Sequence, residues 1–318
     1  MKRIPDAEQT RQGPAYEGRL LDRPDEEVVD QGAPFDVRTL ITRRGVLGLV
    51  GVGLGTAALA ACAPVSSAST TSSTSTPSAT ASASSTSATT TTALPAGEIP
   101  DETAGPYPGD GSNGPDVLEQ SGIVRSDLRT SIGSSTAVDG VPLTFTFTLT
   151  DMANGDAPFA GVAVYAWHCD AQGRYSMYSE GVEDETWLRG VQVADANGQV
   201  TFTSIVPGCY TGRWPHIHFE VYPSIDDITD ASNAIATSQL ALPEAPLTDV
   251  YALAAYDGSA RNLSQVTLTS DNVFGDDGGA LQVATVTGDT TSGYTAALAV
   301  RVDTTTTPSA GQAPGGRR

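Results

Sequence analysis

An alternation of apolar and polar residues with a period of two recurs along the middle of this chain and restricts it to strand-rich folds. From residue 143 to residue 150, Leu and Phe alternate with Thr, and the pattern returns at residues 162–166, 200–202, 217–221, 266–268 and 297–302. Turn signals such as Asn154-Gly155 and Asn197-Gly198 separate these runs. No helical pattern lasts three turns. The expected fold class is therefore all-β, an antiparallel β-sandwich or a related antiparallel barrel.

Composition divides the 318 residues into four parts. Residues 1–62 are a leader, 63–97 a linker dominated by Ser, Thr and Ala, 98–303 the folded domain, and 304–318 a tail rich in Thr, Pro and Gly. A Ser/Thr/Ala run cannot bury enough apolar area to offset the ordering entropy of its backbone. We therefore expect the linker to be a disordered tether, with or without a spacing role, and the tail to be disordered as well.

The leader carries the marks of an export signal. Arg43-Arg44 precedes an uncharged run over residues 45–61 that is short and glycine-rich for a membrane-spanning helix. The arginine pair resembles a twin-arginine export signal, and the Leu-Ala-Ala-Cys sequence ending at Cys62 resembles the lipobox of bacterial lipoproteins. This implies an exported protein held by a lipid on Cys62 at the outer face of the cytoplasmic membrane. An uncleaved anchor is the alternative.

Charge and composition exclude several classes of function. Acidic residues outnumber basic ones 37 to 17, for a formal net charge of −20. Phosphate backbones bind clustered Lys and Arg, so nucleic acid is excluded as a partner. Three histidines and three cysteines are too few for multi-zinc modules or large disulfide frameworks.

Two histidines are the first candidates for chemistry. On a strand, alternation places His216 and His218 on one face while Ile217 and its neighbours at two-residue spacing face the core. Both imidazoles can then reach one metal ion, although such pairs also occur as ordinary polar surface. His168 is expected to be a hydrogen-bonded structural residue.

Two tyrosines extend this pattern into a family resemblance. Tyr175 follows a Gly-containing turn, and Tyr210 precedes the histidine pair. The stretch from residue 161 to residue 221 resembles the intradiol ring-cleavage dioxygenases, and the likeness covers about residues 101–245. It includes an entry motif, Thr-Ala-Gly-Pro-Tyr at residues 103–107, and Leu-Arg-Gly-Val-Gln at residues 188–192.

The resemblance implies a β-sandwich that holds non-haem Fe(III) through Tyr175, Tyr210, His216 and His218. Tyr175 and His218 would be permanent equatorial ligands and His216 an axial one. Tyr210 would be the axial phenolate that leaves when catecholate chelates, taking a substrate proton as general base. Anionic oxygen donors stabilise the ferric state, in which the metal activates the organic substrate rather than O2.

Two further residues have roles implied by the same resemblance. Arg213 matches the family's active-site arginine, a fixed cation for the negative charge that develops in the reaction. Gln239 matches a glutamine beside the site, with a plain strand polar residue as the alternative. The substrates would be a catechol-type diol and O2, with the ring opened between the hydroxyls to give a muconate-type diacid. The identity of the catechol and the oligomeric state stay open, because the leader and tether stand where cytosolic relatives carry a helical dimerisation region.

Two other classes of protein also fit part of this pattern. A cell-surface β-sandwich binding module would explain the tether but would not need both tyrosines. A cupin-like enzyme with Zn or Fe(II) would use the histidine pair, but it usually requires a further ligand downstream, and no histidine follows His218. Cys169 and Cys209 either form the one disulfide available to them outside the cell or remain as buried thiols.

Overall fold

The computed structural model describes residues 8–10, 13–16, 19–20 and 94–308. The predicted signal, Cys62, most of the linker and the tail beyond residue 308 lie outside the described residues. Within the predicted leader, the strands Glu8–Thr10 (β1), Gly13–Tyr16 (β2) and Arg19–Leu20 (β3) form a small antiparallel sheet. The four-part division of the chain stays a prediction.

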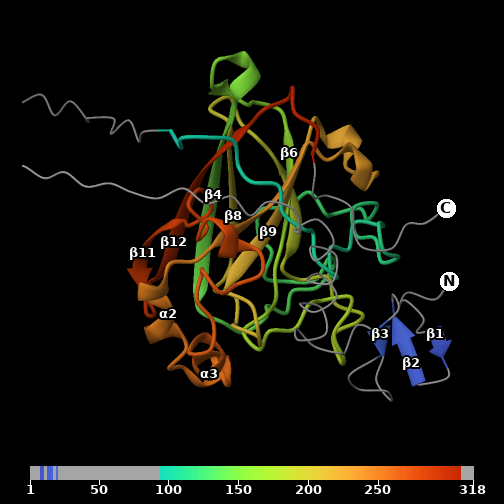
Figure 1. The fold of residues 1–318 in the computed structure, drawn as a ribbon, viewed down its shortest axis with the longest axis vertical. Coiled ribbons are helices and arrows are strands. Elements are labelled where there is room, and N and C mark those ends of the chain that lie inside the picture. Colours follow the sequence, from blue (N-terminus) through green and yellow to red (C-terminus); the bar gives the residue numbers. More distant parts are fainter. Residues whose placement is uncertain (1–7, 11–12, 17–18, 21–93, 309–318) are drawn as a thin grey trace, which may run out of the picture. The chain divides into compact units, whose positions relative to one another are not determined.

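Two sheets build the domain, and this confirms the expected all-β class (Figure 1). One sheet has the order β10-β9-β6-β7 with every pair antiparallel; its strands are Ala163–Trp167 (β6), Arg189–Val193 (β7), His216–Tyr222 (β9) and Ala236–Ala241 (β10). The other has the order β11-β12-β4-β5, with β8 also paired to β4; its strands are Pro142–Asp151 (β4), Ala157–Pro158 (β5), Gln199–Ile205 (β8), Thr285–Asp289 (β11) and Gly293–Val302 (β12).

The core between the sheets follows from the alternation in β4. Phe145 and Phe147 are fully buried there, while the intervening threonines are partly exposed. Phe147 packs against Phe219 of β9 with 4.5 Å between ring centroids, so side chains of the two sheets meet face to face. The period-two pattern thus supplies the inner layer of a sandwich, as expected.

The second face of the β10-β9-β6-β7 sheet is buried too. Every residue of β6, β9 and β10 is buried, although alternation predicted a half-buried β6. Tyr165 and Trp167 of β6 form a second cluster with Tyr175 and Tyr178, which lie in the connection from β6 to β7. Loops therefore cover this face, and the candidate functional residues lie beneath them.

Two expectations about strands were wrong in detail. β12 pairs with β4 in the parallel direction, because no hairpin joins these strands and their relative direction is free. Residues 266–268, predicted as a strand, form a loop in which Thr267 and Ser270 close a turn through their hydroxyls. Apolar-polar alternation over three residues is too short to distinguish the two.

Helices in the described ranges are short, as expected. The α-helices are Glu244–Val250 (α2) and Ser259–Leu263 (α3); the 3-10 helices are Met152–Asn154 (η2), Ile225–Asp227 (η3), Ala231–Asn233 (η4), Ala254–Tyr256 (η5) and Phe274–Asp276 (η6). Among the described residues, none of the helices has the length and apolar character needed to cross a membrane.

Candidate metal centre

Strand β9 presents His216 and His218 on one face. Their Nε2 atoms are 3.1 Å apart, and Ile217 between them belongs to the core between the sheets. Because β9 lies between β6 and β10, its backbone is paired on both sides from His218 onward, and His216 pairs with Ala241 of β10. A strand held in this way keeps the two imidazoles in a fixed arrangement.

The two predicted tyrosines reach the same place from separate loops. Tyr175 lies between β6 and β7, and Tyr210 between β8 and β9. Their phenol oxygens are 3.4 Å apart and lie 3.4 Å and 3.3 Å, respectively, from Nε2 of His216. The structure therefore brings all four predicted ligands together, from one strand and two loops.

The spacing of these donor atoms fits a single metal ion. Bonds of about 2.1 Å, at angles of about 90–110°, place neighbouring donors about 3.0–3.4 Å apart. Nδ1 of His216 contacts the carbonyl oxygen of Trp214, and an Nδ1–H that donates there leaves the Nε2 lone pair directed at the other donors. Among residues 94–308, no group of three or more His, Cys, Asp and Glu residues could hold a metal ion. A metal centre here consequently depends on the tyrosines.

Burial sets the protonation states of the four side chains. Burial, together with the nearby Arg213 cation, lowers the pKa of His216 to about 3, and burial beside His216 lowers the pKa of His218 well below its usual value. Burial raises the pKa of Tyr175 well above 10 and also raises that of Tyr210. At neutral pH the imidazoles are neutral and the phenols are protonated. A bound multivalent cation would favour loss of the phenol protons and so convert the two tyrosines into anionic ligands.

Arg213 and Gln239 also lie at the predicted place. Nη1 of Arg213 is 3.5 Å from Nε2 of His216, and its Nη2 donates to Oε1 of Gln239 at 2.6 Å. Gln239 lies on β10 directly opposite His218, and its amide donates to the carbonyl oxygen of Thr103 at 3.0 Å. The predicted cation and the predicted amide thus form one hydrogen-bonded unit beside the donors.

The partner of Arg213 was not predicted from the sequence. Asp271, which is 2% exposed, accepts from Nε of Arg213 at 3.0 Å and from the backbone N–H of Trp214 at 2.7 Å. Burial, the largest influence, would by itself raise the pKa of Asp271, but Arg213 and the backbone N–H groups of Trp214 and Val273 together lower it. Burial likewise disfavours the Arg213 cation, yet Asp271 and Tyr210 raise its pKa. The sequence Ser270-Asp271-Asn272 indicates only a turn, and nothing in it points to an ion pair with a distant residue.

The entry motif forms a wall of the site. A Cβ at Gly105, where φ is +75°, would lie 3.3 Å from Cε1 of His218, so glycine is required for this approach. The Tyr107 ring lies 4.9 Å from that of Tyr175. Arg189, which is 1% exposed, donates to the carbonyl oxygens of Tyr107 and Ser176 at 2.9 Å and 3.0 Å. It thereby ties the entry motif to the segment that carries Tyr175.

The remaining histidine and cysteines lie outside the donor set. His168 is hydrogen bonded through Nδ1 to the carbonyl oxygen of Cys169 at 2.8 Å and through Nε2 to Ser204 at 2.7 Å, as expected of a structural histidine. Cys169 and Cys209 are buried free thiols, so the structure contains the thiol alternative rather than the disulfide. Burial raises the pKa of Cys209 to about 12.

Comparisons with known proteins give a family match and a shared fold. Residues 113–222 match the protein-family model described as Dioxygenase, which supports an oxidoreductase. An intradiol ring-cleavage dioxygenase from Tetranychus urticae superposes with a TM-score of 0.52 at 24% identity, covering 67% of this chain and 98% of its own. The two proteins share the β-sandwich fold.

Two further structures are also similar to this chain. The dioxygenase domain of a dioxygenase carbohydrate-binding protein fusion from Streptomyces sp. SirexAA-E has a TM-score of 0.42 at 24% identity, covering 65% of this chain and 99% of its own. Catechol 1,2-dioxygenase from Pseudomonas arvilla C-1 has a TM-score of 0.43 at 19% identity, covering 70% of this chain and 67% of its own. Among curated proteins, none matches this sequence.

Proposed function

We propose that residues 98–303 form an intradiol dioxygenase that uses non-haem Fe(III) and O2 to open catechol-type diols to muconate-type diacids. One observation carries the proposal: two phenol oxygens and a second imidazole nitrogen converge on Nε2 of His216, each within 3.4 Å. The dioxygenase match over residues 113–222 points in the same direction.

The chemistry of the donor set favours ferric iron. Phenolates are hard anionic donors, which prefer a trivalent ion and stabilise Fe(III) over Fe(II). When bound, Fe(III) would draw electron density from a chelated catecholate and so make a ring carbon reactive toward O2. Tyr175, Tyr210, His216 and His218 would hold the ion.

The tyrosines differ in exposure, and this supports separate roles. Tyr175 is 2% exposed, whereas Tyr210 is partly exposed. An incoming diol can therefore reach Tyr210, whose phenolate would accept a substrate proton as general base. Arg213, held by Asp271 and Gln239, would stabilise negative charge on the substrate without having to reorient.

The test combines colour, oxygen uptake and product analysis. The full chain loaded with Fe(III) should be red-brown, because phenolate-to-iron charge transfer absorbs visible light, and should consume one O2 per catechol to give a muconate. The substrates are catechol, protocatechuate, hydroxyquinol and chlorocatechols. A semialdehyde product would overturn the mechanism. Full iron loading without turnover of any of these diols would favour a binding module.

We also propose that the protein is exported and anchored by a lipid on Cys62. The Arg43-Arg44 pair, the uncharged run after it and the lipobox-like sequence support this location. Cys62→Ala should release the domain into the medium or leave an unprocessed precursor. An unmodified peptide spanning residues 55–70 in the wild-type protein, found by mass spectrometry, would refute the anchor.

A further inference from the structure

A tight turn over residues 170–174 lies directly before Tyr175 in the chain. The Asp170 N–H donates to the Arg174 carbonyl oxygen at 2.8 Å, and the Gly173 N–H donates back to the Asp170 carbonyl oxygen at 3.1 Å. The Gly208 N–H also donates to the Asp170 carbonyl oxygen, at 2.9 Å. The turn is thereby joined to both chain segments that carry the predicted tyrosine ligands.

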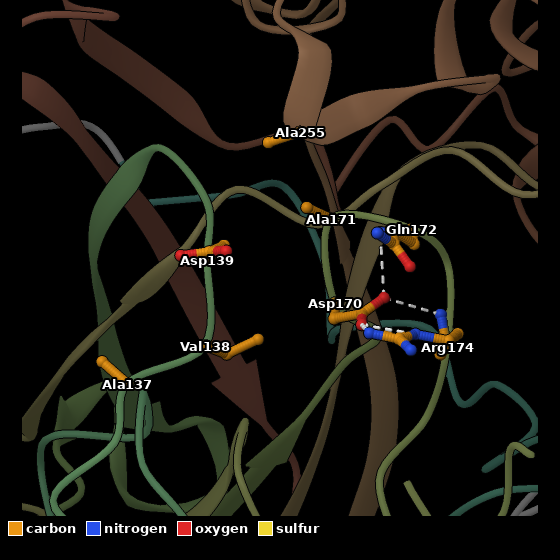
Figure 2. Close-up of a pocket in the computed structure, with 8 residues that line it drawn as sticks. All are labelled: Ala137, Val138, Asp139, Asp170, Ala171, Gln172, Arg174 and Ala255. Carbon is orange, nitrogen blue, oxygen red and sulfur yellow. Dashed lines mark hydrogen bonds and ion pairs between the residues drawn. The ribbon is translucent and has the colours of Figure 1, made fainter. Parts of the chain in front are cut away.

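The carboxylate of Asp170 holds this turn closed. Its side chain is 2% exposed, and one oxygen accepts from the backbone N–H groups of Gln172 and Arg174, both at 2.9 Å. The second oxygen accepts from Nε of Arg174 at 2.9 Å and from its Nη2 at 2.7 Å, as Figure 2 shows. The Arg174 side chain is 41% exposed, so its ion pair is the weaker part of this arrangement.

The outer side of the turn borders an open cavity (Figure 2). This cavity has a volume of about 270 Å³; the turn lines it through Asp170, Ala171, Gln172 and Arg174, and its other walls are Ala137, Val138, Asp139 and Ala255. On this side, where side chains do not fill the space, the hydrogen bonds to Asp170 hold the turn, while Ala171 is buried in the hydrophobic core.

The inner side of the turn touches Tyr210. Gly173 has a φ of +82°, and a Cβ added there would lie 3.0 Å from Cβ of Tyr210. A shift of the turn therefore moves or releases the base of the Tyr210 side chain. The same shift displaces Tyr175, which is the next residue after the turn.

We infer that Asp170 is a positioning residue that sets the placement of the Tyr210 phenol relative to that of Tyr175. The inference rests on the proposed iron centre, since the separation of 3.4 Å between the two phenol oxygens is what a shared metal ion would require. Groups that orient metal ligands affect affinity even though they do not touch the ion.

The experiment measures Fe(III) affinity and the visible charge-transfer band of the full chain. Asp170→Ala should weaken iron binding about 10- to 100-fold and shift the band, because the phenolates move relative to the metal. Asp170→Asn keeps one oxygen for the two backbone N–H groups, and Arg174→Met removes only the exposed partner. Both controls should stay within about fivefold of the wild type.

A pair of glycine variants tests the same contact without disturbing Asp170. Gly173→Ala and Gly161→Ala place a side chain at similar φ values, +82° and +87°, but nothing lies within 4 Å of the Gly161 position. The backbone strain is matched, and only Gly173→Ala presses on Tyr210. The band should shift in Gly173→Ala and not in Gly161→Ala, and this pair decides the question if Asp170→Ala does not fold.

The outcomes separate this inference from the proposed function. A wild-type protein that binds no Fe(III) and shows no visible band would refute the iron centre itself. The positioning role alone would be refuted if the wild type binds iron and both Asp170→Ala and Gly173→Ala keep the wild-type affinity and an unshifted band.

Discussion

Replacing Asp271 with Asn should destabilise the domain strongly, because it breaks a buried ion pair from one side. Asp271 is 2% exposed and Arg213 is 8% exposed, and a single carboxylate oxygen accepts from both Nε of Arg213 and the N–H of Trp214. In Asn, an NH2 group replaces that oxygen and sets donors against donors, while the other oxygen can still accept from the N–H groups of Val273 and Phe274.

The size of the effect follows from burial. Removing one partner of a buried pair leaves an uncompensated charge and costs about 3–5 kcal/mol. For a domain of about 200 residues, 1 kcal/mol corresponds to about 2–4 °C in Tm. Asp271→Asn should therefore lower Tm by about 6 °C or more, as followed by circular dichroism.

Two controls identify the mechanism. Asp127 and Arg129 form an exposed pair, with side chains 48% and 37% exposed, so Asp127→Asn should cost about 1 kcal/mol or less. Arg213→Met combined with Asp271→Asn should be less destabilising than the sum of the single changes, because no buried charge is left. An Asp271→Asn protein that melts within about 2 °C of the wild type, or a double variant that is simply additive, would show that this reasoning is wrong.

Three further outcomes are expected. Tyr175→Phe would remove the permanent anionic ligand of the proposed iron centre and should bleach most of the visible band and reduce iron retention; full occupancy with an unchanged spectrum would rule this residue out as a ligand. Burial lowers the pKa of His168 in the folded protein to about 4, whereas the ordinary pKa of histidine in an unfolded chain is about 6.5. Between these two pH values the unfolded chain therefore binds a proton at His168 that the folded protein does not bind. The free energy of unfolding consequently falls by about 1.4 kcal/mol per pH unit as pH falls from about 6.5 toward 4. Tm measured across this range should fall less steeply in His168→Gln. In protein carrying Cys62→Ala, thiol titration without reductant should detect Cys169 and Cys209 only after denaturation; no thiols even then would establish the disulfide.

Part of the candidate site can be predicted from the sequence, because the patterns that indicate these residues are local. His216 and His218 are two residues apart on a strand, so alternation alone places them on one face. Tyr175 and Tyr210 needed the family resemblance, since nothing in their own sequence neighbourhood distinguishes a ligand from a core aromatic. Their assignment as ligands stays a prediction, although the structure brings all four side chains together.

The amino-acid sequence by itself determined the strand-rich sandwich, because the apolar alternation in β4 leaves one face that must be buried against another layer. Tertiary structure alone decided that the second face of the β10-β9-β6-β7 sheet is covered, that Asp271 holds Arg213 across 58 positions of the chain, and that the 170–174 turn contacts Tyr210. Periodicity reports only which way a side chain points from its own strand. The partner that meets it depends on how distant loops fold over the sheet, and no local pattern carries that information.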